Sequence, residues 1–254
     1  MYYYIFETPK NTTWRTYVDK IQQISREFSI TGEISFTSPA RTAQELVQIG
    51  ITKRYSTIVA VGSDTHINRI INQLVNNPPD IPIALGIIST DPSMMLYEKW
   101  GFKKPEEACE MLKYRKLERF DVGFIEPNHY FFTSARIECK KPTRIILEVD
   151  RWKVEGVIDR AEVSRNLYIL LEKFTKKRSI TKSIINWFVG KEDFDSEKSI
   201  FKGKIIRISS SDSLPVYVGN EVIAYTPINI YRKIHALNII TKRDIPKESS
   251  ANIQ

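Results

Sequence analysis

The sequence predicts an α/β domain with a parallel sheet, followed by an antiparallel β-sandwich domain. Up to about residue 120, short apolar runs alternate with helical patterns, which is typical of parallel strands joined by crossover helices. Beyond that point, short alternating runs separated by turn residues dominate, which indicates antiparallel strands. We therefore expect domains at residues 1–122 and 123–241, and a polar tail at 242–254.

The run TIVAV at 57–61 is the strand of the clearest strand–turn–helix unit in the chain. Its small and β-branched residues suit a strand that is buried on both faces. Gly62 ends the run, and apolar residues recur at helical spacing from Ile67 onward. Asp64 and Thr65 stand where the helix N-cap is expected. In open α/β sheets, ligands bind at such a corner, beside free helix N–H groups.

Other elements of the first domain follow from the same signals. Strands are expected at 2–6, 33–37 and 83–88, and helices at 12–28, 40–50, 94–100 and from 105. The helix at 40–50 is expected to be capped near Ser38, with Pro39 in its first turn.

The second domain is predicted from short alternating runs. They lie at 121–126, 129–138, 143–149, 153–159, 166–172, 204–210, 215–227 and 235–241. Residues 172–200 are expected to form a helix or loop with a basic start.

The net charge of +8 is concentrated in the second half of the chain. Residues 125–254 hold 23 Lys and Arg against 16 Asp and Glu. Such an excess suits nucleotide phosphates, an anionic membrane or nucleic acid, or else serves solubility. The basic residues at 176–182, followed by Trp187 and Phe188, could contact an anionic bilayer or form a solvated loop.

The two cysteines, Cys109 and Cys139, have no metal-site or disulfide spacing. The N-terminus lacks the pattern of a signal peptide, and no apolar run reaches the ~20 residues that span a bilayer. We therefore expect a cytoplasmic protein, with peripheral membrane contact left open.

The sequence GSDTHINR at 62–69 resembles the GGDGTxNE motif of the diacylglycerol kinase (lipid kinase) family. Three positions match the motif: Gly62, Asp64 and Asn68. Four positions depart from it: Ser63, Thr65, His66 and Arg69. The lost glycines are the residues that let a backbone approach phosphate closely.

Two further segments support the resemblance. Leu85–Phe102 aligns with the family's LGIIPLGTGNDFARxLGI and keeps Gly86, but 91–95 replace the GTGND centre. Residues 216–230 resemble the family's DGE segment, in which Glu221 matches the glutamate assigned as general base. The loop at 7–10, Glu-Thr-Pro-Lys, does not match the family's Asn-Pro and Ser-Gly loop.

The resemblance implies a Rossmann-like first domain, as in NAD kinases and lipid kinases. It also implies phospholipid metabolism, with ATP-dependent phosphoryl transfer to a lipid hydroxyl aided by Mg²⁺. Catalysis would rest on Asp64, which would also hold the metal, and on Glu221. The implied nucleotide-binding residues are Gly62, Ser63, Asp64, Thr65, His66, Asn68, Arg69 and Gly86.

Each of these residues also has a plainer interpretation. Asp64 would serve only as a helix N-cap, His66 as a polar turn residue, and Glu221 as a solvated turn residue. Arg69 would contact phosphate, pair with Asp64 or face solvent.

Three functions therefore remain open at this stage. The first is an active lipid kinase that binds ATP and a lipid acceptor. The second is a catalytically inactive protein of the same fold that binds nucleotide or lipid. The third is an NAD kinase. A nucleic-acid partner is not favoured.

Overall fold

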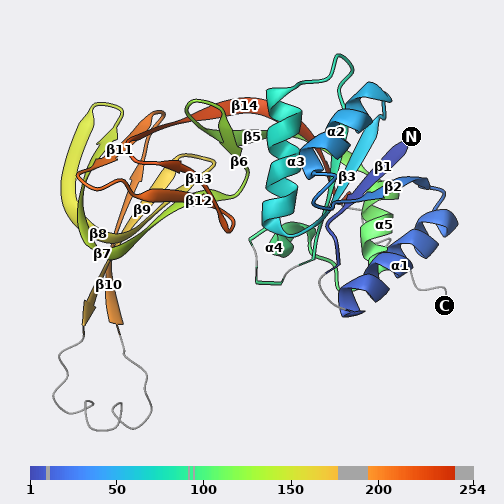
Figure 1. The fold of residues 1–254 in the computed structure, drawn as a ribbon, viewed down its shortest axis with the longest axis horizontal. Coiled ribbons are helices and arrows are strands. Elements are labelled where there is room, and N and C mark those ends of the chain that lie inside the picture. Colours follow the sequence, from blue (N-terminus) through green and yellow to red (C-terminus); the bar gives the residue numbers. More distant parts are fainter. Residues whose placement is uncertain (10–11, 91, 94, 177–193, 244–254) are drawn as a thin grey trace, which may run out of the picture. The chain divides into compact units, whose positions relative to one another are not determined.

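The computed structural model describes residues 1–254 except 10–11, 91, 94, 177–193 and 244–254 (Figure 1). The chain divides into two compact units. The first unit comprises 1–120 with 235–254, and the second comprises 121–234.

The first unit is an α/β structure in which helices alternate with strands, as predicted. Its strands are β1 (Tyr2–Phe6), β2 (Gly32–Phe36), β3 (Thr57–Gly62) and β4 (Ala84–Ser89). Its helices are α1 (Thr12–Glu27), α2 (Ala43–Thr52), α3 (Asp64–Asn76), α4 (Tyr97–Trp100) and α5 (Pro105–Lys113). None of the helices described in the chain is long and apolar enough to cross a membrane.

The parallel sheet of this unit is covered by helices on both faces. Helix α1 packs beside α5, and α2 packs beside α3 (Figure 1). Successive tyrosines of β1 reach different helices, because side chains alternate along a strand. The Tyr2 hydroxyl donates to the Leu112 carbonyl of α5 across 3.0 Å. The ring of Tyr3 lies against Gly50 of α2, where an added Cβ would be 2.9 Å from Tyr3 Cδ1.

The strand order fixes where a crevice can form. It runs β4, β3, β1, β2: the chain passes from β1 to β2 on one side and then returns to β3 on the other side of β1. In open α/β sheets, ligands bind beyond the carboxyl ends of the strands at such a reversal. The pairing of β3 with β4 continues to Gly62 and Ser89, at the same carboxyl end.

The sheet gains a further strand from the end of the chain. Strand β14 (Ile228–Thr241) pairs in parallel with β4 through Asn238 and Ile239. Residues 235–241 therefore belong to the first unit, whereas the sequence placed them in the second domain. Their alternating pattern indicated a strand but could not indicate its partner.

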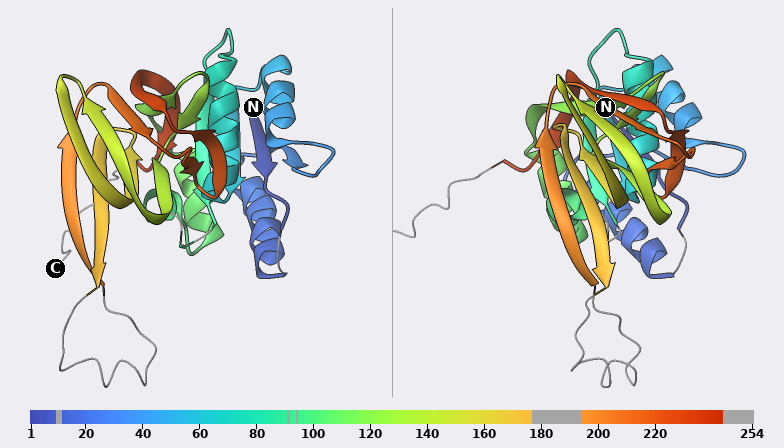
Figure 2. Two further views of the ribbon diagram at one scale, coloured as in Figure 1. Left: turned by 60° about the vertical axis from the view of Figure 1, so that its left-hand side comes forward. Right: turned by 90° about the vertical axis from the view of Figure 1, so that its left-hand side faces the viewer.

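The second unit is built of antiparallel strands, as predicted (Figure 2). Strand β7 (Ser134–Val149) is central: it pairs with β8 (Trp152–Ser164) on one side and with β11 (Ile206–Ser210) and β12 (Pro215–Val218) on the other. The remaining strands are β6 (His129–Phe131), β9 (Tyr168–Lys176), β10 (Phe194–Lys202), β13 (Glu221–Tyr225) and β5 (Lys116–Ile125), of which residues 116–120 belong to the first unit. One apolar cluster, which includes Ile145, Leu147 and Ile206, forms its core.

Three predicted elements were wrong in detail. Helix α2 starts at Ala43 rather than near Pro39, because Thr42 and Glu45 form a reciprocal capping box. The short helix expected at 94–100 covers only Tyr97–Trp100. Within 172–200, the described residues at either end lie in β9 and β10 rather than in a helix or loop. The remainder of that basic segment, 177–193, lies outside the described residues.

Candidate functional site

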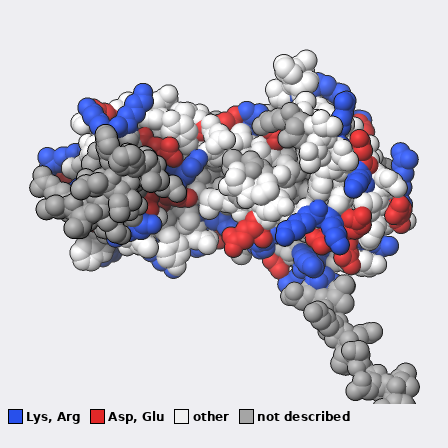
Figure 3. Space-filling view, turned by 90° about the horizontal axis from the view of Figure 1, so that it is seen from below, with Lys and Arg blue, Asp and Glu red and all other residues white. Residues whose placement is uncertain are grey.

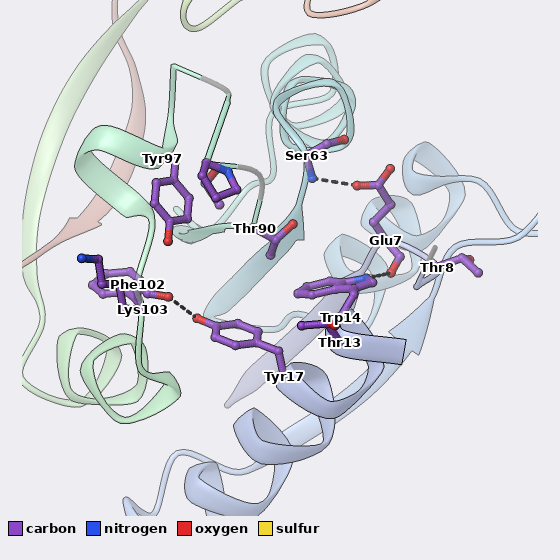
Figure 4. Close-up of a pocket in the computed structure, with 12 residues that line it drawn as sticks. Glu7, Thr8, Thr13, Trp14, Tyr17, Ser63, Thr90, Tyr97, Phe102 and Lys103 are labelled. Carbon is purple, nitrogen blue, oxygen red and sulfur yellow. Dashed lines mark hydrogen bonds between the residues drawn. The ribbon is translucent and has the colours of Figure 1, made fainter. Parts of the chain in front are cut away.

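A pocket of about 520 Å³ lies at the carboxyl ends of β1, β3 and β4 in the first unit (Figure 4). Helix α1 and the segment that follows β4 complete its walls. The lining residues are Glu7, Thr8, Thr13, Trp14, Tyr17, Ser63, Ser89, Thr90, Pro92, Tyr97, Phe102 and Lys103. Its volume is typical of a small-molecule site.

Glu7 occupies the corner of this pocket beside α3. It directly follows β1, and its backbone N–H continues the ladder by donating to the Val61 carbonyl across 2.8 Å. Its carboxylate accepts the backbone N–H of Ser63 across 2.7 Å, as drawn in Figure 4. The Glu7 carboxylate therefore occupies the Ser63 N–H at the start of α3, a position where bound anions commonly accept such hydrogen bonds.

The N-cap of α3 is Ser63, one residue earlier than predicted. Its Oγ accepts the backbone N–H of His66 across 3.4 Å. Asp64, expected as the cap, is 4% exposed, and its Oδ2 accepts the backbone N–H of Leu96 across 3.2 Å. The Asp64 carboxylate therefore fixes the segment after β4, since a buried carboxylate is stable only when it is hydrogen-bonded.

His66 is a buried residue that hydrogen-bonds α3 to β1, rather than an exposed polar turn residue. Its side chain is 2% exposed, and Nε2 lies 3.1 Å from the Ile5 carbonyl, to which it donates because a carbonyl can only accept. Burial lowers the pKa of His66 below the usual range for histidine. The imidazole is therefore neutral and ties α3 to β1.

The other predicted nucleotide-binding residues are spread along α3 and β4. Thr65 and Asn68 are half-buried on α3, and Arg69 is exposed. Gly86 lies inside β4, where an added Cβ would be 2.7 Å from Leu112 Cδ2 of α5. Of the eight predicted residues, Ser63 is the one that lines the pocket.

Gly62 makes the corner between β1 and α3 possible. An added Cβ there would be 2.7 Å from Glu7 Cβ and 2.8 Å from His66 Cδ2. Only glycine leaves room for both side chains at this point. Gly62, which matches the motif, therefore leaves room for the side chains of Glu7 and His66. His66 stands where the motif has threonine.

Aromatic side chains form the opposite part of the pocket, and sequence reasoning did not assign them to a site. The rings of Trp14 and Tyr17 stack with centroids 5.8 Å apart. Trp14 Nε1 donates to the Glu7 carbonyl across 3.3 Å, and the Tyr17 hydroxyl donates to the Phe102 carbonyl across 3.1 Å (Figure 4). Burial raises the pKa of Tyr17, so its hydroxyl stays protonated and remains a donor. The overlooked signal was an aromatic pair at i, i+3 in the first turns of the helix after β1.

Ser89 lies in the pocket wall. It ends β4, is 1% exposed, and its Oγ has no hydrogen-bond partner among the described residues. A buried hydroxyl without a partner is costly, by about 1–3 kcal/mol. The hydroxyl oxygen is buried behind the pocket wall rather than open to the pocket.

Glu221 lies in the second unit. It opens β13 directly after a turn in which Gly219 has φ 59°, and it is half-buried. The Arg136 side chain supports this turn by donating from Nη2 to the Gly219 carbonyl across 2.7 Å. The shared site for Asp64 and Glu221 that the resemblance implies stays a prediction.

The residues at the α3 N-terminus do not fit a triphosphate bound as in the motif. The Ser63 N–H already donates to a carboxylate, and Asp64 faces the Leu96 N–H. A phosphate at this corner would meet the charge of Glu7 where it needs a donor. Separately, no group of three His, Cys, Asp or Glu side chains in the described part of the chain could hold a metal ion.

Comparison with known proteins identifies the class of fold. A crystal structure of a diacylglycerol kinase from Bacillus anthracis superposes with a TM-score of 0.72 at 17% identity, covering 94% of this chain and 96% of that chain. An NAD kinase from Archaeoglobus fulgidus in complex with ATP gives 0.55 at 16% identity, over 96% and 94%. Yeast NADH kinase complexed with NADH gives 0.57 at 10% identity, over 100% and 89%. The chain thus has the fold shared by diacylglycerol and NAD kinases.

The family match is more specific. Residues 7–125 match the model of the diacylglycerol kinase catalytic domain, which confirms the predicted resemblance. No protein in the curated set matches the chain. Over those residues, the chain is similar to the diacylglycerol kinase catalytic domain, with departures in the motif at 62–69.

Proposed function

We propose that this protein binds a small molecule in the pocket at the strand ends and does not transfer phosphoryl groups from Mg²⁺-bound ATP. The contact between the Glu7 carboxylate and the Ser63 N–H carries this proposal, because it puts a fixed negative charge at the corner where the family motif lies. Of the three functions that the sequence left open, the proposal is nearest to the second, a catalytically inactive protein of the same fold that binds nucleotide or lipid.

The repulsion between a carboxylate and a bare phosphate supports the proposal. Two unit charges about 4 Å apart repel by roughly 4 kcal/mol at the effective dielectric constant near a protein surface. Such a penalty corresponds to about a thousandfold weaker binding. The exposed amino group of Lys103 also lines the pocket, but solvent and salt screen exposed charges.

Lipid phosphorylation is the second candidate, and the family match over residues 7–125 favours it. It would use ATP and Mg²⁺ with Asp64 at the metal, Glu221 as general base and a lipid hydroxyl as acceptor. It ranks second because the Asp64 carboxylate is buried and accepts a backbone N–H from the segment after β4. An NAD kinase activity ranks third.

Membrane contact receives no support from the visible charge distribution. On the face shown in Figure 3, Lys and Arg side chains are interspersed with Asp and Glu rather than gathered in one basic area. An anionic bilayer attracts clusters of basic residues that lie close together. The basic residues at 177–182 are outside the described part of the chain.

A labelled-phosphate assay tests the proposal. The purified full chain would be incubated with γ-labelled ATP, Mg²⁺ and vesicles of diacylglycerol in phosphatidylcholine, and in parallel with NAD. We expect no label in the lipid or in the NAD product. Label in lipid that disappears in both Asp64→Asn and Glu221→Gln would overturn the proposal in favour of the lipid kinase.

A further inference from the structure

We propose that one end of the second unit binds the surface of an anionic membrane. This end consists of residues 150–153, in and after the turn between β7 and β8, and residues 203–205, which lead into β11; we call these residues the tip. The inference is independent of the proposed function, because the tip shares no residue with the pocket in the first unit. It follows from the exposed apolar side chains, the hydrogen-bonded backbone and the charge of the tip.

Two large apolar side chains of the tip are exposed. Trp152 is 77% exposed and Ile205 is 49% exposed. Both lie at the same end of three neighbouring strands, because Val149 at the end of β7 is opposite Trp152 of β8 and opposite Ile206 of β11. Folding normally buries such side chains, since their burial is strongly favourable. Large apolar side chains that gather at the surface therefore mark an interaction site.

Asp150 fixes the backbone of the tip. Its Oδ1 accepts the backbone N–H groups of Ile205 across 2.9 Å and of Lys204 across 2.8 Å. Its own backbone N–H donates to the Ile205 carbonyl across 3.0 Å. The N–H groups of Ile205 and Lys204 lower the pKa of the Asp150 carboxyl, so it stays ionised and keeps both bonds at neutral pH. Trp152 and Ile205 are therefore held at the surface by a preformed structure, which reduces the entropy lost on binding.

Basic residues flank these apolar residues along the chain. Arg151, Lys153 and Lys204 are all exposed, and the single acidic residue of the tip already accepts two backbone N–H groups. Glu148 lies opposite Lys153 but pairs with Arg207 across 3.6 Å. Within the described part of the chain, Arg151 and Lys153 form no ion pair. The tip therefore presents positive charge beside its apolar side chains.

This combination suits a membrane better than a folded protein partner. Tryptophan is favoured at the boundary between lipid headgroups and acyl chains, because its ring is apolar and its N–H is polar. Isoleucine can enter the apolar layer while Lys and Arg side chains reach the lipid phosphates. Each basic residue near an anionic surface strengthens binding by about fivefold. A stable protein interface instead buries about 800 Å² on each partner, which two exposed apolar side chains do not supply.

Binding through so small a group is expected to be weak and reversible. It combines insertion of two apolar side chains with the attraction of a few charges, and neither part alone gives stable attachment. It needs a local group of basic residues, and not the extended basic area that the face in Figure 3 lacks. Removing either part should therefore weaken the binding.

Vesicle sedimentation of the purified full chain tests the inference. Vesicles of phosphatidylcholine alone are compared with vesicles that also contain phosphatidylserine, at low and at physiological salt. We expect the protein to sediment with the phosphatidylserine vesicles, and less so at the higher salt because salt screens exposed charges. Equal sedimentation with both kinds of vesicle, or none with either at low salt, would overturn the inference.

Two pairs of variants assign the binding to the tip. Ile205→Ser and Lys153→Gln should each weaken binding to phosphatidylserine vesicles by about fivefold, with the circular dichroism of the folded chain preserved. Ile81→Ser and Lys20→Gln make the same changes at exposed positions of the first unit and should leave binding unchanged. Equal effects of the tip and control variants would contradict the inference. So would an effect of Lys153→Gln without one of Ile205→Ser, because it would show adsorption by charge alone.

Trp152 provides a direct readout of insertion. Bromine atoms on lipid acyl chains quench the fluorescence of a tryptophan that enters the bilayer. The chain holds four tryptophans, so the unchanged protein is compared with Trp152→Phe, which keeps an aromatic ring at the tip. We expect brominated vesicles that contain phosphatidylserine to quench a larger fraction of the fluorescence of the unchanged protein. Equal fractional quenching of the two proteins would overturn the inference.

Discussion

The Asp64 carboxylate and the Leu96 backbone N–H are joined by a hydrogen bond of 3.2 Å, which connects the first turn of α3 to the segment that precedes α4. Leu96 is 4% exposed, as is Asp64, so both partners are shielded from water. The aspartate kept from the family motif thus has a structural role that does not require any ligand. This role gives the first of four predictions.

Replacing Asp64 by alanine should destabilise the fold. The change leaves the buried Leu96 N–H without its acceptor, which typically costs about 1–3 kcal/mol. Urea unfolding followed by circular dichroism measures the free energy of unfolding. Asp80→Ala, at an exposed position, is the matched control and should change it by less than about 0.5 kcal/mol. Equal effects in the two variants would contradict the role assigned to Asp64.

Gly62→Ala should be poorly tolerated, whereas Gly156→Ala should be neutral or stabilising. At Gly62 the new methyl group would lie 2.7 Å from Glu7 Cβ, so the corner must shift at a cost of about 1–3 kcal/mol. At Gly156 no atom lies within 4 Å of an added Cβ, and alanine restricts the unfolded chain. Thermal unfolding measures the shift in melting temperature relative to the unchanged protein. We expect a decrease for Gly62→Ala and no change or an increase for Gly156→Ala. A Gly62→Ala protein as stable as Gly156→Ala would contradict the crowding seen at this corner.

Stability should fall on mild acidification because of His66. Burial lowers the pKa of His66 in the folded state, so the unfolded chain binds a proton more readily. Its contribution is complete above the unfolded pKa of about 6.5 and is lost as the pH falls through that value toward the lower folded pKa. The free energy of unfolding should therefore decrease between about pH 7 and pH 5.5, by up to about 1.4 kcal/mol per pH unit.

The variant His66→Gln isolates this effect. The glutamine amide can still donate to the Ile5 carbonyl but does not titrate, so the decrease over the same pH interval should be smaller. Urea unfolding at several pH values measures both slopes. Identical slopes in the two proteins would show that the acid sensitivity comes from other groups.

Tyr17→Phe should lower stability slightly and loosen the pocket wall. The variant removes the hydroxyl that donates to the Phe102 carbonyl, a loss of about 0.5–1.5 kcal/mol for a typical hydrogen bond. Tyr114→Phe removes a hydroxyl from an exposed ring of the same unit and serves as the control. Chemical denaturation of both variants provides the measurement. A Tyr114→Phe effect as large as that of Tyr17→Phe would contradict the role of this contact.

The parallel sheet and its helices were predictable because their signals are local. The apolar run at 57–61 and the helical spacing from Ile67 lie within single elements, and the structure has β3 and α3 there. The start of α3 was not predictable in the same way. Ser63, Asp64 and Thr65 are all residue types that can cap a helix N-terminus. The Asp64 carboxylate instead accepts the Leu96 N–H, a contact that the sequence does not reveal.

The pocket was only partly predictable for the same reason. Its location at the strand ends follows from the topology of parallel sheets, and Ser63 was among the predicted residues. Glu7 and Trp14 were missed because the loop after β1 no longer resembles the family's loop, and its contact with α3 forms only when the chain folds. The place of the last strand beside β4 depends on pairing over long sequence distance, which alternation alone does not reveal.

The pairing of β14 with β4 has a consequence for synthesis of the protein on the ribosome. The first unit needs residues from both ends of the chain, and the second unit is encoded as an insertion between them. Until residues 235–241 leave the exit tunnel, the apolar edge of β4 stays open and can pair with another strand. Nascent chains stopped within the second unit should therefore aggregate or recruit chaperones, although almost all of the α/β sequence has already been made.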